Sequence, residues 1–146
     1  MISWRETYRG LLPDAFLARM SEAGFTRRFR RALTNPGDSI TLVGASRCSA
    51  SRHGIPGKAE IATLHILRQS QGCGLGAQLM KETSRALAAQ GATSLMISVL
   101  RDNIRARGFY EHLGGEPEEA RQEPGPGGRL LFEVAYRWAD IRSLTA

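Results

Sequence analysis

Three glycines fall within five residues of the stretch QSQGCGLGAQLM, just before a segment with helical periodicity. At Gly72, Gly74 and Gly76 a ligand can approach the backbone closely, because no side chain stands in its way. The first turn of a helix carries unpaired amides and a partial positive charge, so a phosphate group placed there is hydrogen-bonded and electrostatically favoured. The spacing therefore predicts an anion-binding loop, although a tight turn alone would use the same residue type.

Two other phosphate-binding motifs fit this stretch less well. Gly72, Gly74 and Ala77 match the G-x-G-x-x-A pattern of dinucleotide-binding folds. Such folds carry an acidic residue about twenty positions further on, where this chain is rich in alanine, and Asp102 comes too late. A Walker A motif would need Gly-Lys-Ser or Gly-Lys-Thr after the glycines, and the sequence has neither there. The loop is therefore interpreted as a phosphate cradle of another type.

Apolar patterning on both sides of the loop predicts a strand, a helix and a second strand. EIATLHIL, residues 60–67, is typical of a strand, and residues 74–90 carry apolar side chains on one helical face until Gly91 ends the pattern. SLMISVL, residues 94–100, hardly alternates, which indicates a strand covered on both faces. A unit of this kind favours parallel pairing of its two strands.

The remaining segments predict helices and a hairpin around this unit. Residues 12–33 are mostly helical in pattern, and residues 104–113 form a short amphipathic helix that ends at two glycines. ITLVGAS, residues 40–46, predicts one strand. Two strands around the loop PGPGG predict a hairpin near the carboxyl end. The length of 146 residues suits one domain over residues 1–146.

A second motif follows the predicted strand at residues 94–100. It reads N-x-x-A-x-x-F-Y-x-x-x-G and is met by Asn103, Ala106, Phe109, Tyr110 and Gly114. The glycine-rich loop fits Q/R-x-x-G-x-G/A from Gln71 onward. With both motifs in this order, the sequence from about residue 4 to residue 138 resembles the GNAT-type N-acetyltransferases.

The resemblance implies an α+β (mixed α/β) fold with a central mixed sheet, a splayed parallel strand pair and flanking helices. The family's first strand has no counterpart before the helical segment that starts near residue 4. Residues 35–47 have room for one strand where the family has a hairpin. We therefore expect a reduced sheet of about five strands, with an exposed edge that a second copy could cover as a homodimer.

The resemblance also implies acetyl-CoA as the co-substrate, without a metal. The backbone amides of residues 73–77 would hold the pyrophosphate, and the strand end at residues 64–67 would pair with the pantetheine arm. Asn103 would hydrogen-bond this arm, and Tyr110 would lie near the thioester sulfur. The residues assigned to the cofactor are Leu64, Ile66, Gln71, Gly72, Cys73, Gly74, Leu75, Gly76, Ala77, Asn103 and Tyr110. Asn103 could instead serve only as a helix N-cap, and Tyr110 only as a core residue.

The implied reaction is attack of a primary amine on the acetyl carbonyl, through a tetrahedral intermediate that expels the CoA thiolate. Tyr110 is the candidate general acid, since an ordinary tyrosine protonates a thiolate at a cost of about 2 kcal/mol. A strand amide near Ile66 could polarise the carbonyl. Glu60 is the candidate general base by the resemblance, with His65 or solvent as alternatives. Strand alternation places Glu60 and His65 on opposite faces unless a bulge intervenes.

The net charge of +6 and the pI near 10.1 raise the question of nucleic acid. The arginines are scattered apart from one cluster at residues 27–31, and no zinc-finger spacing accompanies them, so a nucleic-acid partner is not expected. No apolar run is long enough to span a bilayer, and no secretion signal opens the chain, so we expect a cytoplasmic protein. Cys48 and Cys73 have no metal or disulfide spacing and are expected to be reduced thiols. An acyl-CoA-binding module without turnover is the main alternative function.

Overall fold

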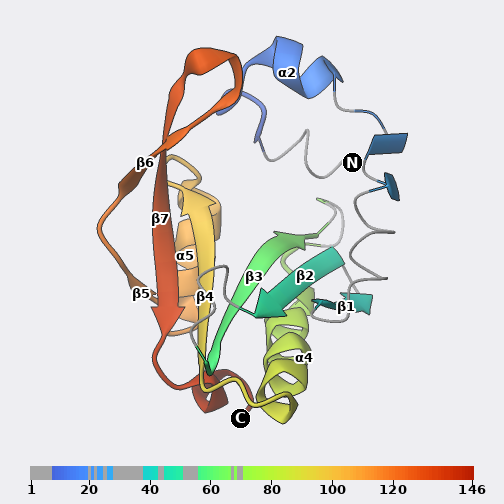
Figure 1. Cartoon of the computed structure of the whole chain (residues 1–146), viewed down its shortest axis with the longest axis vertical. Helices are drawn as coiled ribbons and strands as arrows, with labels where there is room; N and C mark the ends of the chain where they lie inside the picture. Colours follow the sequence, from blue (N-terminus) through green and yellow to red (C-terminus); the bar gives the residue numbers. More distant parts are fainter. Residues whose placement is uncertain are drawn as a thin grey trace.

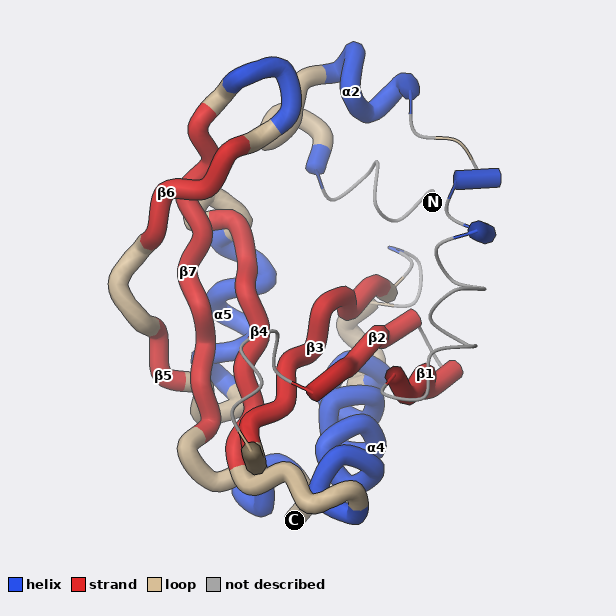
Figure 2. Tube along the Cα trace, in the orientation of Figure 1, coloured by secondary structure: helices blue, strands red, loops and turns tan. Residues whose placement is uncertain are grey.

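The computed structural model describes residues 8–19, 21, 23–24, 26–27, 38–42, 45–50, 56–66, 68 and 71–146. Its strands are β1 (Asp38–Leu42), β2 (Ala45–Ala50), β3 (Lys58–His65), β4 (Ser94–Leu100), β5 (Glu116–Pro117), β6 (Arg121–Pro124) and β7 (Leu130–Trp138). Its helices are α2 (Asp14–Arg19), α4 (Leu75–Ala89) and α5 (Ile104–His112), with the short 3-10 turns η2 (Pro126–Gly128) and η3 (Ile141–Leu144). Figures 1 and 2 show one mixed sheet with α4 beside β3 and α5 beside β4 and β7.

The two central strands run parallel and then separate. The sheet order is β1-β2-β3-β4-β7-β5, and β6 also pairs with β7. β3 pairs with β4 only from Lys58↔Ser94 to Ile61↔Ile97. Beyond this point β4 keeps its antiparallel partner β7 as far as Leu100, while β3 stays with β2 as far as His65. The predicted parallel pair and its splay are therefore both present.

Two expectations for the sheet were wrong. The run at residues 40–46, expected as one strand, is divided between β1 and β2, which pair antiparallel up to Leu42↔Ala45. Only two positions separate these strands, and a connection of two residues is long enough to close a hairpin. The sheet has seven strands and not about five. Among the described residues before β1 no strand is present, and residues 1–7, on which the expected lack of an amino-terminal strand depends, lie outside the described residues.

The other predicted elements lie where the patterns placed them. The carboxyl-terminal hairpin is β6 paired with β7, and α4 and α5 match the two predicted helices after the glycine-rich loop and after Asn103. Of the helix predicted over residues 12–33, α2 and residues 23–24 and 26–27 are helical, and much of the rest lies outside the described residues. None of the helices described could span a membrane.

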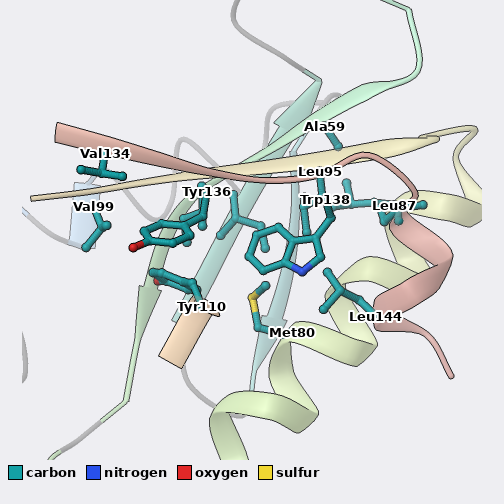
Figure 3. Packing of buried hydrophobic residues seen from close by; sticks show 13 residues of the cluster. Ala59, Met80, Leu87, Leu95, Val99, Tyr110, Val134, Tyr136, Trp138 and Leu144 are labelled. Atoms are coloured by element: carbon teal, nitrogen blue, oxygen red, sulfur yellow. The ribbon is translucent and has the colours of Figure 1, made fainter. Parts of the chain in front are cut away.

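One hydrophobic core fills the space between the sheet and α4, α5 and η3 (Figure 3). Leu79, Met80, Thr83 and Leu87 recur at helical spacing on the buried face of α4, which is why this segment packs as an amphipathic helix. Burying each large apolar side chain of this kind contributes about 1.5–3 kcal/mol. The sheet contributes side chains of β3, β4 and β7, namely Ala59, Ile61, Leu95, Ile97, Val99, Val134, Tyr136 and Trp138.

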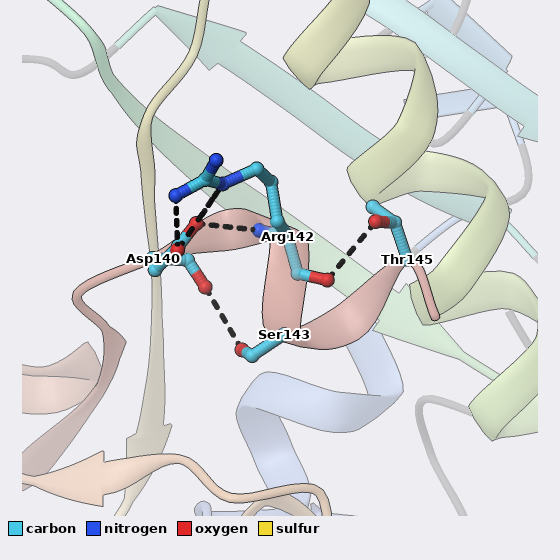
Figure 4. Close-up of polar contacts among 4 residues, drawn as sticks. All are labelled: Asp140, Arg142, Ser143 and Thr145. Atoms are coloured by element: carbon cyan, nitrogen blue, oxygen red, sulfur yellow. Dashed lines mark hydrogen bonds and ion pairs between the residues drawn. The ribbon is translucent and has the colours of Figure 1, made fainter.

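The last turn of the chain, η3, closes one end of this core. Ile141 and Leu144 are buried against α4, with relative exposures of 1% and 7%. The Asp140 carboxylate caps η3 by accepting a hydrogen bond from the backbone N–H of Arg142 and also binds the Arg142 guanidinium at 2.8 Å (Figure 4). These bonds lower the pKa of Asp140 to about 2. The cap keeps η3 in the conformation that buries its two apolar residues.

Candidate functional site

The start of α4 leaves its backbone amides open. Gly74 occupies the N-cap position at φ 83°, and no side chain caps the helix. The first intrahelical bond runs from Gln78 N to Gly74 O at 3.0 Å, so the amides of residues 75–77 have no partner within the helix. Gly72 also has a positive φ of 81°, a conformation that non-glycine residues rarely adopt. The predicted loop is thus a glycine turn that presents helix amides.

Space above this turn is open at two glycines and filled at the third. A β-carbon built on Gly72 or Gly74 would have no neighbour within 4 Å among the described residues. At Gly76 it would lie 3.0 Å from Cζ of Phe109 and 3.1 Å from Cδ1 of Ile66. Gly72 and Gly74 therefore face a space that a ligand can enter, whereas Gly76 lets α4, α5 and the end of β3 pack together.

Two polar side chains of the loop have distinct surroundings. Gln71 is half-buried and donates from Nε2 to the Ile66 carbonyl at 2.8 Å, which ties the loop to the end of β3. Cys73 is exposed and forms no disulfide among the described residues, and the side chain of Cys48 lies outside the description. The Gln71 side chain therefore supports the loop, and what the loop offers an anion is its backbone N–H groups.

The start of α5 is closed by a side chain. Asn103 is its N-cap and accepts a hydrogen bond at Oδ1 from the backbone N–H of Ala106, at 3.3 Å. The capping interpretation of Asn103 is thereby confirmed. The bond uses only the oxygen of the amide, and Nδ2 carries two further donors that can serve a ligand. Capping and cofactor binding by Asn103 are compatible for that reason.

The ring of Tyr110 belongs to the core. It is 5% exposed, and its centroid lies 5.3 Å from Phe109, 5.6 Å from Tyr136 and 6.2 Å from Trp138. Figure 3 shows it among the side chains of β4 and β7. Burial raises the pKa of its hydroxyl, and the nearby Tyr8 raises it further. Tyr110 therefore keeps its proton throughout the physiological pH range.

A bulge in β3 brings Glu60 and His65 to the same face of the sheet. Cys48 of β2 pairs with Ile61 and Arg47 pairs with Thr63, so Ala62 has no partner in the ladder. Ile61 and Leu64, three positions apart, both pack on the core. Glu60 and His65 alternate with these two residues and so share the opposite face. Glu60 is 6% exposed, and burial lowers the pKa of His65 to about 4.

Tyr8 is a member of this site that the sequence did not indicate. Its ring meets His65 edge-on at a centroid distance of 6.5 Å. Burial raises the pKa of Tyr8, and the negative charge of the half-buried Glu133 on β7 raises it further. Tyr8, His65 and Glu133 come from distant parts of the sequence, and no short motif links them. Together they line the side of the sheet away from α4, next to the splay.

The predicted cofactor residues fall into two groups around the splay. Leu64 and Ile66 belong to the end of β3 beyond its last pair with β4, and Leu67 lies outside the described residues. The loop and the first turn of α4 follow directly, while Asn103 and Tyr110 belong to the start and middle of α5. Among the described residues no three His, Cys, Asp or Glu side chains are grouped so that they could hold a metal ion.

Comparison with known proteins relates this arrangement to one family. Residues 3–115 match the family model described as the acetyltransferase (GNAT) family. Among solved structures, the chain is similar to the PaiA N-acetyltransferase of Thermoplasma acidophilum in complex with coenzyme A, with 19% identity and a TM-score of 0.64 over 94% of this chain and 87% of that one. It is also similar to the ribosomal-protein-S18-alanine N-acetyltransferase of Escherichia coli, with 20% identity and a TM-score of 0.57 over 76% and 74% of the two chains.

A plant enzyme shares the same fold at lower identity. NAA60 of Arabidopsis thaliana, solved in complex with a bisubstrate analogue, is 13% identical with a TM-score of 0.57 over 65% of this chain and 63% of that one. The chain covers 60% of another matched structure, an acetyltransferase-type protein of Desulfovibrio desulfuricans. These likenesses establish the fold, with its mixed sheet and flanking helices.

Proposed function

Because the chain belongs to the acetyltransferase (GNAT) family, we propose that it transfers an acetyl group from acetyl-CoA to a primary amine of a small molecule or peptide. The observation that carries this proposal is the uncapped start of α4 behind Gly74, which faces open space. A diphosphate there receives several N–H donors and the favourable end of the helix dipole. The PaiA structure in complex with coenzyme A supports this cofactor.

The cofactor would lie along the splay. Its diphosphate is bound by the amides of residues 73–77, and its pantetheine arm runs beside Leu64 and Ile66, where β3 no longer has β4 as a neighbour. The amide-rich arm then replaces the missing strand by hydrogen bonding to exposed strand backbone. Asn103 donates from Nδ2 to the same arm while its Oδ1 caps α5.

Tyr110 supplies a proton to the departing CoA sulfur. Its raised pKa guarantees the protonated form at neutral pH. A weaker acid transfers its proton less readily, but a thiolate formed in the same buried site is destabilised too, so its own pKa also rises. Because the pKa of the tyrosine and the pKa of the thiol both rise, the free-energy cost of the proton transfer stays close to that between an ordinary tyrosine and an ordinary thiolate. On giving up its proton the hydroxyl becomes a tyrosinate, which solvent must reprotonate before the next turnover.

Glu60 accepts the proton of the attacking amine, directly or through water. It is buried on the face of the sheet opposite α4, together with His65, because of the bulge at Ala62. His65 is neutral at physiological pH, but its low pKa makes it a weak base. Glu60 is proposed as the base on the family resemblance and its burial on this face, with His65 as the alternative. The acceptor amine would enter from this face.

Release of coenzyme A in the presence of a panel of amines and peptides tests the function. Tyr110→Phe should lower turnover tenfold or more, with coenzyme A affinity nearly unchanged, because the ring stays packed and only the proton donor is lost. An unchanged rate would remove Tyr110 from the mechanism. Tight coenzyme A binding without turnover of any acceptor would favour a binding module, and steeply salt-dependent binding of DNA or RNA would favour a nucleic-acid protein.

A homodimer is a further part of the proposal. β1 ends the strand order at one edge of the sheet, and strand edges invite pairing with a second copy. Sedimentation of the purified protein would detect the dimer, and a monomer at all concentrations would rule out this assembly.

A further inference from the structure

Tyr136 of β7 joins the core to a polar network on α5. Its side chain is fully buried, with 0% exposure, and its ring lies 5.6 Å from the ring of Tyr110 at an interplanar angle of 41° (Figure 3). Its hydroxyl donates to Oε1 of Glu111 at 2.6 Å and accepts from Nε of Arg107 at 3.0 Å. The neighbour of Tyr110 is therefore fixed by two charged side chains of the helix that carries Tyr110.

Arg107 extends this network to the start of α5. Its NH1 donates to the carbonyl of Arg101 at 3.2 Å, in the connection between β4 and the helix. Its NH2 lies 3.9 Å from Oε1 of Glu111. One guanidinium thus links the turn that precedes Asn103, the middle of the helix and the sheet.

The network attaches α5 to β7 on both sides of Tyr110. Arg107 and Glu111 are four positions apart and lie on one stripe of the helix, three positions before Tyr110 and one after it. A helix of nine residues has little stability of its own, so its place is decided by tertiary contacts. Hydrogen bonds with a charged partner are about twice as strong as neutral ones, which makes this attachment firm.

We propose that Tyr136 and Arg107 are positioning residues for acetyl transfer: they hold α5 so that the Tyr110 hydroxyl lies at the thioester sulfur. This inference rests on the proposed function. Catalytic groups need placement within about 0.5 Å, and among the described residues the ring of Tyr110 contacts the rings of Phe109, Tyr136 and Trp138. Tyr136 in turn is bound through its hydroxyl to Arg107 and Glu111 of the helix that carries Tyr110.

Two variants test the positioning role. Tyr136→Phe keeps the ring and removes the hydroxyl, and Arg107→Gln removes the guanidinium without touching Tyr136's packing. Each should lower kcat about tenfold, with coenzyme A affinity within about twofold of the unmodified protein, since a small displacement of a catalytic group slows the chemical step. Circular dichroism confirms that each variant is folded. Unchanged kcat in both variants would overturn the inference.

Arg85 offers a matched control. It is also a helical arginine that binds a carboxylate of its own helix, Glu82 at 3.0 Å, and a distant carbonyl, that of Thr145 at 3.3 Å. It lies on α4, in the part that packs on η3. Arg85→Gln should therefore leave kcat unchanged. An equal loss in Arg85→Gln and Arg107→Gln would show a general effect of removing a helix-to-carbonyl bond and would overturn the inference.

A double-mutant cycle separates positioning from general support of the site. If Tyr136 acts through the Tyr110 hydroxyl, then Tyr136→Phe costs turnover in the unmodified protein and almost nothing in a Tyr110→Phe background. If Tyr136 merely supports the fold, the fold-reductions in turnover caused by Tyr136→Phe and by Tyr110→Phe multiply in the double variant. Multiplicative losses would overturn the inference.

A spectroscopic measurement keeps the inference independent of turnover. The chain has three tyrosines, so ¹³C labelling of their hydroxyl-bearing carbons gives three resonances, which Tyr110→Phe and Tyr136→Phe assign by loss. Arg107→Gln should move the resonances of Tyr136 and Tyr110 and leave that of Tyr8 in place. A Tyr110 resonance that does not move contradicts the positioning role. Failure of the unmodified protein to acetylate any amine contradicts the proposed function instead.

Discussion

The connections from β3 to α4 and from β4 to α5 leave the same end of the sheet and are built in opposite ways. After Ile61, β3 no longer pairs with β4, and residues 66–74 lead to a helix whose N-cap residue, Gly74, has no side chain to bind its first amides. β4 stays paired with β7 as far as Leu100, and residues 101–103 lead to a helix capped by Asn103. The connection to α4 is long and leaves the helix start without a side-chain cap, whereas the connection to α5 is short and ends in a side-chain cap.

The contrast indicates which of the two helix starts is the better candidate for an anion site. Both helices have the same unpaired amides and the same dipole. At α5 the Asn103 side chain accepts one of these N–H bonds, whereas at α4 the N-cap residue is Gly74, which has no side chain. Residue type at a single position thus decides whether the amides serve the protein or a ligand.

The largest expected effect comes from closing the open connection. Gly74→Val should weaken coenzyme A binding at least 100-fold, as measured by calorimetry. Valine disfavours φ 83°, and its side chain would stand in the space above the helix amides. Gly91→Val is the matched control, because Gly91 has φ 92° and open space at the other end of α4. Equal affinity losses in the two variants would contradict the assignment of the loop.

The stability of the protein should depend on pH through His65, the half-buried histidine at the end of β3. The pKa of His65 is about 4 in the folded protein and about 6.5 in the unfolded chain, so between these values the unfolded state binds more protons. Stability should therefore fall as the pH drops from about 6.5 to about 4, by about 3 kcal/mol. Urea unfolding at several pH values measures the slope.

His65→Gln should flatten this acid-dependent slope, because glutamine does not titrate. His112→Gln is the control, since His112 is exposed on α5. A slope that persists in His65→Gln would assign the proton uptake to another group.

The smallest effect is expected at the closed connection. Asn103→Ala removes the cap and should cost about 1 kcal/mol of unfolding free energy, whereas Asn103→Asp keeps an accepting oxygen and should cost little. Both variants lack Nδ2, so both should bind coenzyme A more weakly. Thermal unfolding and calorimetry separate the two roles. Full affinity in both variants would leave Asn103 with capping as its only role.

The elements around the two connections could be predicted because their signals are local. Gly72, Gly74 and Asn103 mark helix starts by residue type, and Gly91 marks a helix end. The apolar run of residues 94–100 predicts the strand correctly, and it pairs on both edges, but only one of its faces is fully covered: Leu95, Ile97 and Val99 are buried, whereas Ser98 on the other face is exposed. Each of these features depends on a few neighbouring residues.

The features that were missed depend on distant parts of the chain. The bulge at Ala62 leaves no sequence signature, yet it decides that Glu60 and His65 share a face. Tyr8 and His65 are far apart in the sequence, and only the folded chain brings their rings together. The β1–β2 hairpin was taken for one strand because its connection is too short to interrupt the apolar pattern. Tertiary context settled each of these.

At Gly76 the first turn of α4 packs against α5 and against Ile66, just after β3. With 3.0 Å to the Phe109 ring and 3.1 Å to Ile66 for even a single added carbon, the first turn of α4 cannot move without pushing on the residue next to Tyr110. Close-packed interiors transmit displacement and do not absorb it. If coenzyme A binds at the glycine turn as proposed, the bound and unbound forms should therefore differ in α5 as well as in α4, and the position of Tyr110 should shift with α5.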